Sequence, residues 1–116
     1  MKKYTKTHEW TKAEDGVLYV GISRHAVHEL GDIVYVELPE VGADVTGGAP
    51  ACEIESVKAV AEVNSPVTGS VCKVNDALEG PPELLVGDPD AWIFAVQPSE
   101  AAEGLMTEEE YLAYLG

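Results

Sequence analysis

Lys58 is the residue of this chain whose type and setting best suit covalent chemistry. It lies in the segment 53–62, EIESVKAVAE, where one short apolar run ends and another begins. A lysine amine is a nucleophile, and acylation removes its charge. The chain has only seven Lys and Arg residues against 21 Asp and Glu. A lysine in this setting is poorly suited to a core and well suited to presentation to another protein, so we take it as a candidate modification site.

The other chemistry-bearing side chains give weaker signals. Cys52 and Cys72 are twenty residues apart, without a C-x-x-C motif or clustered histidines, so neither a zinc site nor a redox motif is supported. We expect two free, buried thiols in a reducing compartment. His25 and His28 have the i,i+3 spacing of two metal ligands on a helix, but the sequence places no third ligand. We expect this histidine pair to be inert.

The composition indicates a soluble globular chain. A length of 116 residues suits one domain, 1–116, and 46% hydrophobic residues with eleven glycines and seven prolines indicates a turn-rich fold. No apolar run reaches the length of a membrane span. The formal net charge of −14 argues against nucleic acid and anionic lipid as partners. That charge suits a soluble protein that meets basic partner surfaces, although solubility alone also explains it. We expect a cytoplasmic monomer.

Apolar alternation predicts mostly short strands around two helices. The expected strands are 4–10, 17–22, 33–38, 49–54, 59–64, 69–75 and 92–96. Ser23 is a helix-capping residue before a helix over 24–30, and Gly31 stands at the stop position. The strand 33–38 has the pattern of a buried strand. Strands this short and this closely spaced favour a sandwich or flattened barrel over an α/β sheet.

A second helix is predicted over 107–115. Thr107 and Glu110 have the spacing of a capping box, and Met106 with Tyr111 that of a hydrophobic staple. An apolar face would then pack onto the sandwich, and its members would be Leu105, Tyr111, Leu112 and Leu115.

A weak internal repeat relates the two halves of the chain. The segment GDIVYV at 31–36 can be laid over GSVCKV at 69–74, and about twenty residues later each copy has a further strand. Those later strands are 51–54 and 92–96. Two like halves around a central hairpin would place Lys58 at one end of the fold.

Several ordered segments resemble the glycine cleavage H-protein family of lipoyl carriers. They are YTKTHEW at 4–10, VGIS at 20–23, LGDIVYVELPEVG at 30–42, ESVKA at 55–59, PEL at 82–84 and DP at 88–89. The resemblance covers nearly the whole chain, and the segment 30–42 is its most specific part. It implies a mainly β, lipoyl-domain-like barrel-sandwich hybrid of two antiparallel sheets with quasi-two-fold halves.

The resemblance also implies a function. In that family the lysine equivalent to Lys58 carries lipoate in amide linkage. The lipoyl arm takes the aminomethyl group of glycine from a pyridoxal-phosphate glycine decarboxylase to a tetrahydrofolate-dependent aminomethyltransferase, and dihydrolipoyl dehydrogenase then reoxidises it. A lipoate ligase or lipoyl transferase would modify the lysine. On this resemblance the chain is a non-catalytic carrier, because the hard chemistry belongs to cofactors.

Two glutamates stand at family positions that contact the loaded, cationic arm. They are Glu9 and Glu62, whose carboxylates could accept hydrogen bonds from the arm's amine; the alternative for each is a solvated surface charge. The chain departs from the family pattern elsewhere. Glu29 stands where some relatives have histidine, Val86 replaces a frequent asparagine, and the loop 88–92 is shorter than usual. These departures affect arm docking and partner affinity.

Three other functions fit parts of the pattern. A biotin carrier uses a similar hairpin, but its lysine is normally flanked by methionines, whereas Val57 and Ala59 flank Lys58. A lipoyl-relay protein, which passes lipoate to other enzymes, fits the same fold and stays open. An unmodified acidic β-sandwich that acts as a binding module also stays open, and the mass of the natively purified protein separates it from both carriers.

Overall fold

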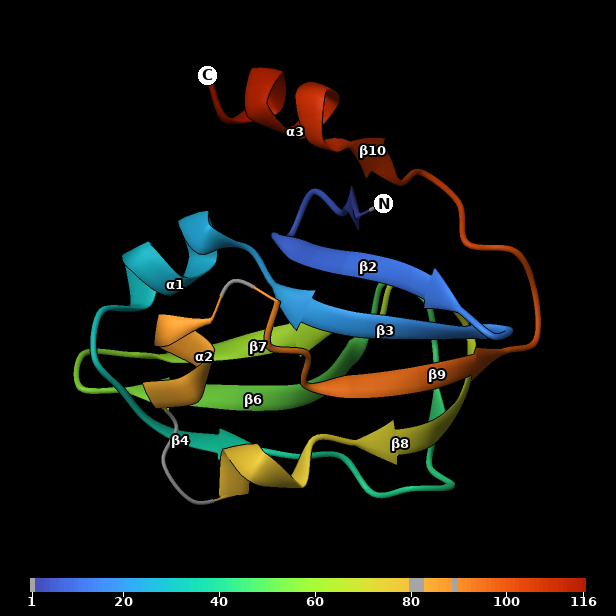
Figure 1. Cartoon of the computed structure of the whole chain (residues 1–116), viewed down its shortest axis with the longest axis horizontal. Coiled ribbons are helices and arrows are strands. Elements are labelled where there is room, and N and C mark those ends of the chain that lie inside the picture. Colours follow the sequence, from blue (N-terminus) through green and yellow to red (C-terminus); the bar gives the residue numbers. More distant parts are fainter. Residues whose placement is uncertain (1, 80–82, 89) are drawn as a thin grey trace.

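The computed structural model describes residues 2–79, 83–88 and 90–116 as two antiparallel sheets with a few short helices (Figure 1). The strands are β1 (Lys3–Tyr4), β2 (Glu9–Glu14), β3 (Val17–Ile22), β4 (Ile33–Glu37), β5 (Asp44–Val45), β6 (Pro50–Ser56), β7 (Val60–Asn64), β8 (Gly69–Val74), β9 (Phe94–Pro98) and β10 (Met106–Thr107). The helices are α1 (Arg24–Leu30), α2 (Glu83–Gly87) and α3 (Glu108–Leu115), with a 3₁₀ turn η1 at Asp76–Glu79.

The two sheets differ in size and enclose one apolar core. The larger has the order β10-β1-β2-β3-β9-β8-β5, and the smaller has the order β4-β6-β7. In β6 the side chains of Cys52 and Ile54 are buried while those of Glu53 and Glu55 are exposed, the alternation expected of a strand with one buried face. The predicted class, mainly β with two antiparallel sheets, is therefore confirmed. Within the described residues the two sheets do not join into a closed barrel.

The sequence repeat corresponds to two similar strand pairs. β4 pairs with β6 in the small sheet, and β8 pairs with β9 in the large one. The first pair has a register shift between Ile33 and Tyr35, and the second has one between Val71 and Lys73. These residues are equivalent when the two repeat segments are laid over each other, so both halves bend their strand with a bulge at the same position.

The two predicted helices form where their caps indicated. Ser23 Oγ accepts a hydrogen bond from the amide of Ala26, and Gly31 adopts φ 74° at the end of α1. At the C-terminus, Thr107 and Glu110 form the predicted capping box at the start of α3. These ends form as predicted because capping is satisfied within one turn of the chain.

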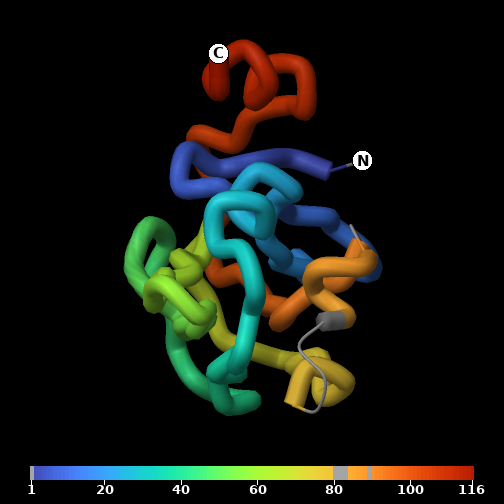
Figure 2. The backbone as a smooth tube through the Cα atoms, turned by 90° about the vertical axis from the view of Figure 1, so that its left-hand side faces the viewer, coloured from blue at the N-terminus to red at the C-terminus, as the bar shows by residue number. Residues whose placement is uncertain are grey.

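The packing of α3 differs from the prediction, because only one of the four predicted residues is buried. Tyr111 is buried, whereas Leu112 is 59% exposed and Leu105 and Leu115 are only half-buried. Tyr111 instead stacks on Tyr4 of β1, with ring centroids 4.5 Å apart and planes 7° apart. Figure 2 shows the resulting arrangement, in which the C-terminal helix lies over the N-terminal segment.

Several predicted strands are corrected by the structure. The expected strand 4–10 is split into β1 and β2 by a turn in which His8 has φ 76° and its amide donates to Thr5 O. β4 is not buried throughout, because Val34 and Tyr35 are 49% and 55% exposed. β9 begins at Phe94, two residues later than the expected strand 92–96.

Other local features complete the comparison with the sequence. β5, β10, η1 and α2 were not predicted. Of the two free thiols, Cys52 is buried as expected but Cys72 is only half-buried. Pro82 and Pro89, two of the residues that carry the resemblance, lie outside the described residues.

Candidate functional site

Lys58 lies exposed in the turn that joins β6 to β7. The turn is held from inside by Ser56, which is itself buried. The amide of Ser56 donates to Ala59 O at 2.8 Å, and Ser56 Oγ donates to the same carbonyl at 3.1 Å while it accepts the Ala59 amide at 3.1 Å. The Lys58 amide also points at Ser56 Oγ, at 3.4 Å. The turn is therefore a defined loop that presents one amine to solvent.

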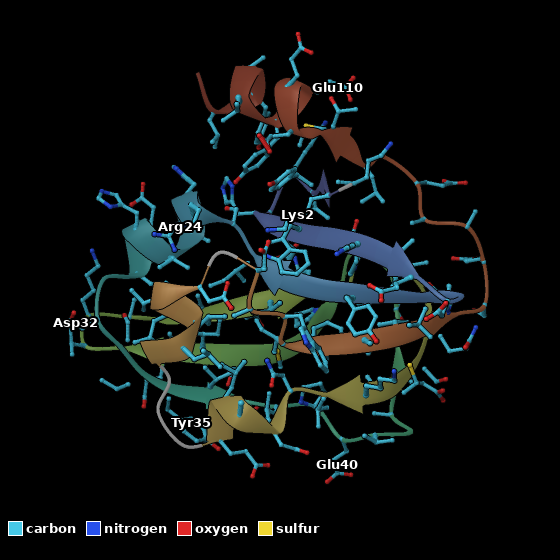
Figure 3. All side chains as sticks on the ribbon, viewed as in Figure 1. Lys2, Arg24, Asp32, Tyr35, Glu40 and Glu110 are labelled. Carbon is cyan, nitrogen blue, oxygen red and sulfur yellow. The ribbon has the colours of Figure 1, made fainter. Side chains whose placement is uncertain are left out.

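The turn is also held from outside, by the segment that follows α1. The amide of Val57 donates to Asp32 O at 3.0 Å. A Cβ at Gly31 would lie 3.7 Å from Lys58 Cε, so the aliphatic part of the lysine passes beside the end of α1. In Figure 3 Asp32 lies at the same end of the molecule as this turn. Val57 precedes Lys58 and Val60 follows two residues after it, and the two side chains are 68% and 59% exposed, so the turn also carries exposed apolar surface.

A pocket of about 330 Å³ lies between α1, β7 and the start of β2. Its buried apolar lining consists of Ile22, Leu30, Ile54 and Val63. Its polar lining consists of Thr7, His8, Glu9, His25, Glu29 and Glu62. α1 contributes to this pocket and also ends beside the Lys58 turn, so the candidate attachment site and the pocket share one wall.

Glu9 is the most unusual carboxyl group of the site because it is 1% exposed. Its Oε1 accepts hydrogen bonds from the hydroxyls of Thr5, at 2.6 Å, and Thr7, and its Oε2 accepts the Asn64 amide at 3.3 Å. Burial raises the pKa of Glu9, and these hydrogen bonds to the charged form oppose that shift. The alternative that Glu9 is a solvated surface charge is wrong.

Glu62 has a different setting, because it is exposed and lies at the pocket's edge. Across the small sheet it stands opposite Glu53, which in turn stands opposite Glu37. This row of three carboxylates makes the outer face of the small sheet strongly acidic beside the pocket. It also lowers the stability of the sheet, because like charges directly opposite each other repel.

The structure brings histidines to the pocket that sequence reasoning did not assign to it. His25 Nε2 lies 3.7 Å from Glu29 Oε1, and the His25 ring centroid is 4.7 Å from that of His8. Burial and then the neighbouring His25 lower the pKa of His8. His28 does not line the pocket. Among the described residues no group of three or more His, Cys, Asp or Glu side chains is placed to hold a metal ion.

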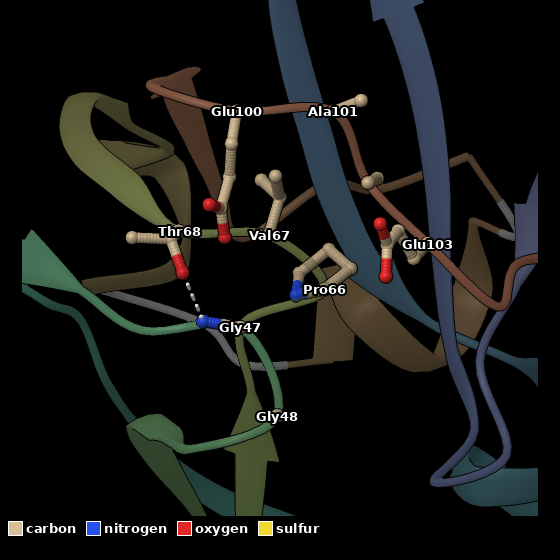
Figure 4. A pocket seen from close by; sticks show the side chains of 9 residues that line it. Gly47, Gly48, Pro66, Val67, Thr68, Glu100, Ala101 and Glu103 are labelled. Atoms are coloured by element: carbon tan, nitrogen blue, oxygen red, sulfur yellow. Dashed lines mark hydrogen bonds between the residues drawn. The ribbon is translucent and has the colours of Figure 1, made fainter.

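A larger pocket lies elsewhere, between the turns of the two sheets. It has a volume of about 460 Å³ and is lined mainly by the segments 47–48, 66–68 and 100–103. Figure 4 shows Glu100 and Glu103 on one side of it and the hydrogen bond from the Gly47 amide to Thr68 Oγ1, which is 2.9 Å long. Lys58 is not part of its lining, so this pocket is separate from the candidate attachment site.

In the portion that the structure covers, no helix combines the length and apolar character needed to cross a bilayer.

Burial, followed by the charges of Glu37 and Glu9, raises the pKa of the Cys52 thiol to about 12. Cys52 is therefore a protonated core residue and not a nucleophile.

Comparisons with known proteins agree on one family. A family model described as glycine cleavage H-protein matches residues 2–116. A probable glycine cleavage system H protein of Thermococcus gammatolerans is 55% identical over 117 residues, which cover 97% of this chain and 87% of that protein. The glycine cleavage system H protein of Thermotoga maritima is 49% identical over 115 residues, 96% and 93% of the two chains. The crystal structure of a glycine cleavage system H protein from Mycobacterium marinum matches with a TM-score of 0.92 at 38% identity, over 99% of this chain and 96% of that one.

Proposed function

The chain belongs to the glycine cleavage H-protein family, and on that premise we propose that the amine of Lys58 carries lipoate in amide linkage. The observation that supports this most directly is the exposed lysine in a turn that is braced on two sides. Inside the turn Ser56 holds its backbone, and outside it the Val57 amide bonds to Asp32. A modifying enzyme needs the amine in one orientation relative to an activated acyl group, and such a turn supplies it.

The pocket beside the turn fits the group that Lys58 would hold. Glu62 follows Lys58 by four residues, from the turn into β7, so the two backbone positions lie at most about 13 Å apart at roughly 3.3 Å per residue. A lipoyl-lysine side chain extends on the order of 15 Å at ordinary bond lengths. The apolar lining of the pocket suits the hydrocarbon part of the arm, and its carboxylates suit a cation at the arm's end. Glu9 and Glu62 are the residues we propose for that contact.

When bound, the lipoyl group supplies a disulfide that takes up the aminomethyl group of glycine. The protein's own residues would hold and shield this arm. Lys58 would anchor it, the apolar lining of the pocket would exclude water from it, and the carboxylates would bind the positive charge at its end. We propose that the chain is a non-catalytic carrier, cytoplasmic and monomeric. Its proposed partners are the pyridoxal-phosphate decarboxylase, the tetrahydrofolate-dependent aminomethyltransferase, dihydrolipoyl dehydrogenase and a lipoate ligase or transferase.

Mass spectrometry of the natively purified protein tests the attachment. We expect the mass increment of one lipoyl amide, located on Lys58 by peptide mapping and abolished in Lys58→Arg. Lys12→Arg is the matched control, because it also replaces a lysine, but in β2 and away from the turn, and it should be modified normally. An adduct that persists in Lys58→Arg, or that maps to another lysine, refutes the proposal.

A second assay separates a glycine carrier from a protein that only relays lipoate to other enzymes. The lipoylated protein is added to the purified decarboxylase, and exchange of labelled bicarbonate into glycine is followed. A glycine carrier should support exchange that saturates with its concentration. A relay protein should be lipoylated and yet leave exchange at the background of the decarboxylase alone.

A further inference from the structure

One hydroxyl group of the C-terminal helix joins two walls of the pocket. Tyr111 Oη lies 2.7 Å from His8 Nδ1 and 2.8 Å from Ser23 Oγ, although these residues are 103 and 88 positions away in the sequence. The Tyr111 side chain is 3% exposed, and its ring is fixed by the stack on Tyr4. The hydroxyl is therefore held in place by its own helix and by β1.

The two groups that it contacts control different parts of the pocket. Ser23 caps α1 by accepting the Ala26 amide at 3.2 Å, and α1 supplies Glu29 and Leu30 among others to the pocket. His8 lines the same pocket from the turn before β2. A shift of His8 would change the shape of the cavity directly, because His8 lines it, and a shift of Ser23 would do so through α1, which it caps.

His8 needs such support more than most residues. Its φ of 76° lies in the left-handed region that non-glycine residues rarely adopt. Local hydrogen bonds hold the backbone: the His8 amide donates to Thr5 O at 3.2 Å, and the Ser23 amide donates to His8 O at 2.9 Å. The bond to Tyr111 is the contact that fixes the ring rather than the backbone.

We propose that Tyr111 is a positioning residue that sets the pocket by fixing the His8 ring and the start of α1 together. The C-terminal helix thereby determines how well the pocket retains the loaded arm. The part that concerns the arm rests on the function proposed above, whereas the fixing of His8 does not.

Two arrangements of protons give the single hydroxyl hydrogen of Tyr111 a partner in this hydrogen-bond chain. Either Ser23 donates to Tyr111 and Tyr111 donates to His8 Nδ1, or His8 Nδ1 donates to Tyr111 and Tyr111 donates to Ser23. In both arrangements Nδ1 is engaged and Ser23 Oγ still accepts the Ala26 amide. Tyr111→Phe keeps the aromatic ring and its packing on Tyr4 but leaves Nδ1 without this partner.

The test uses Tyr111→Phe with Tyr114→Phe as the matched control. Tyr114 lies on the same helix, and its hydroxyl donates instead to Lys6 O at 3.3 Å in an exposed position. On the unlipoylated proteins, nitrogen NMR of the imidazole groups should show both His8 ring signals shifted in Tyr111→Phe and unchanged in Tyr114→Phe. Circular dichroism confirms that both variants are folded.

On the lipoylated proteins, the loaded form should lose its one-carbon unit roughly three- to tenfold faster in Tyr111→Phe, the scale of one lost hydrogen bond. The rate of lipoylation should stay at the wild-type value in both variants. Unchanged His8 signals, or equal effects of the two substitutions, overturn the positioning role. Shifted His8 signals together with an unchanged rate of loss of the one-carbon unit overturn the proposal that Tyr111 affects how the pocket retains the loaded arm. Absence of lipoate from Lys58 in the wild type refutes the proposed function, while the NMR result still decides the role of Tyr111.

Discussion

Ser56→Ala is the change that best tests whether the geometry of the Lys58 turn matters. Ser56 Oγ makes a donor and an acceptor bond to Ala59, both 3.1 Å long, and accepts the Lys58 amide at 3.4 Å. Each bond contributes about 0.5–1.5 kcal/mol net. The lower part of that range applies here, because the freed amides of the exposed turn can bond to water. The expected loss of unfolding free energy is about 1–2 kcal/mol.

A loss of that size lowers Tm by roughly 4–8 °C in a domain of this length. The fold should survive, because the Ser56 amide still bonds to Ala59 O and the Val57 amide still bonds to Asp32 O. The lysine itself is unchanged, but the turn that aims it is less rigid. Lipoylation by the ligase should therefore slow by on the order of tenfold, since orientation of the amine is part of the rate.

The assays are denaturant unfolding and the initial rate of lipoylation measured by intact mass. Ser99→Ala is the control, because Ser99 Oγ also donates to a backbone carbonyl, that of Thr68, but in an exposed loop away from Lys58. It should be lipoylated at the wild-type rate. If Ser56→Ala loses the expected stability and is still modified at the wild-type rate, the turn is only a tether and the reasoning from its geometry is refuted.

Two further predictions concern the pocket carboxylates. The pKa of Glu9 is raised in the folded state, so the folded protein binds this proton more tightly than the unfolded chain does. The free energy of unfolding should therefore fall as the pH rises from about 4.3, the ordinary glutamate pKa, through the pKa of Glu9 in the folded protein. Thr7→Val removes a donor to the ionised form, so it should raise that pKa further and steepen the decline, measured by carbon NMR titration and urea unfolding; an unchanged titration contradicts this. Glu62→Gln should hasten loss of the one-carbon unit severalfold while leaving lipoylation intact. Glu53→Gln, which changes the same carboxylate row outside the pocket, should not hasten that loss. Equal effects of the two substitutions would show that Glu62 acts only as a general surface charge.

Sequence reasoning succeeded where the determining interactions are local. The ends of α1 and α3 follow from Ser23, Gly31, Thr107 and Glu110, because a helix end is satisfied by side chains within one turn. The hairpin that presents Lys58 is local in the same sense, since its strands are adjacent in the chain. The repeat also anticipated the two like halves, in which the structure then shows bulges at equivalent residues.

Sequence reasoning failed where a residue's surroundings come from distant segments. Tyr35 belongs to an apolar run, yet it is exposed, after a register shift in β4 and opposite the exposed Glu55 of β6. The predicted strand 4–10 is broken at His8, whose left-handed backbone is held by Ser23 from the end of β3. Apolar alternation gives no sign of either, because it describes which side chains are apolar and not which neighbours they meet.

The sequence by itself determined the helix ends of this protein and the hairpin that exposes Lys58, because those depend on contacts between residues close in the chain. Only the tertiary structure decided that Glu9 is buried, that a pocket lies beside the turn, and that Tyr111 reaches His8 across 103 residues. Burial and long-range hydrogen bonds depend on which surfaces meet when the sheets pack. That pairing is set by the whole core at once and by no single segment.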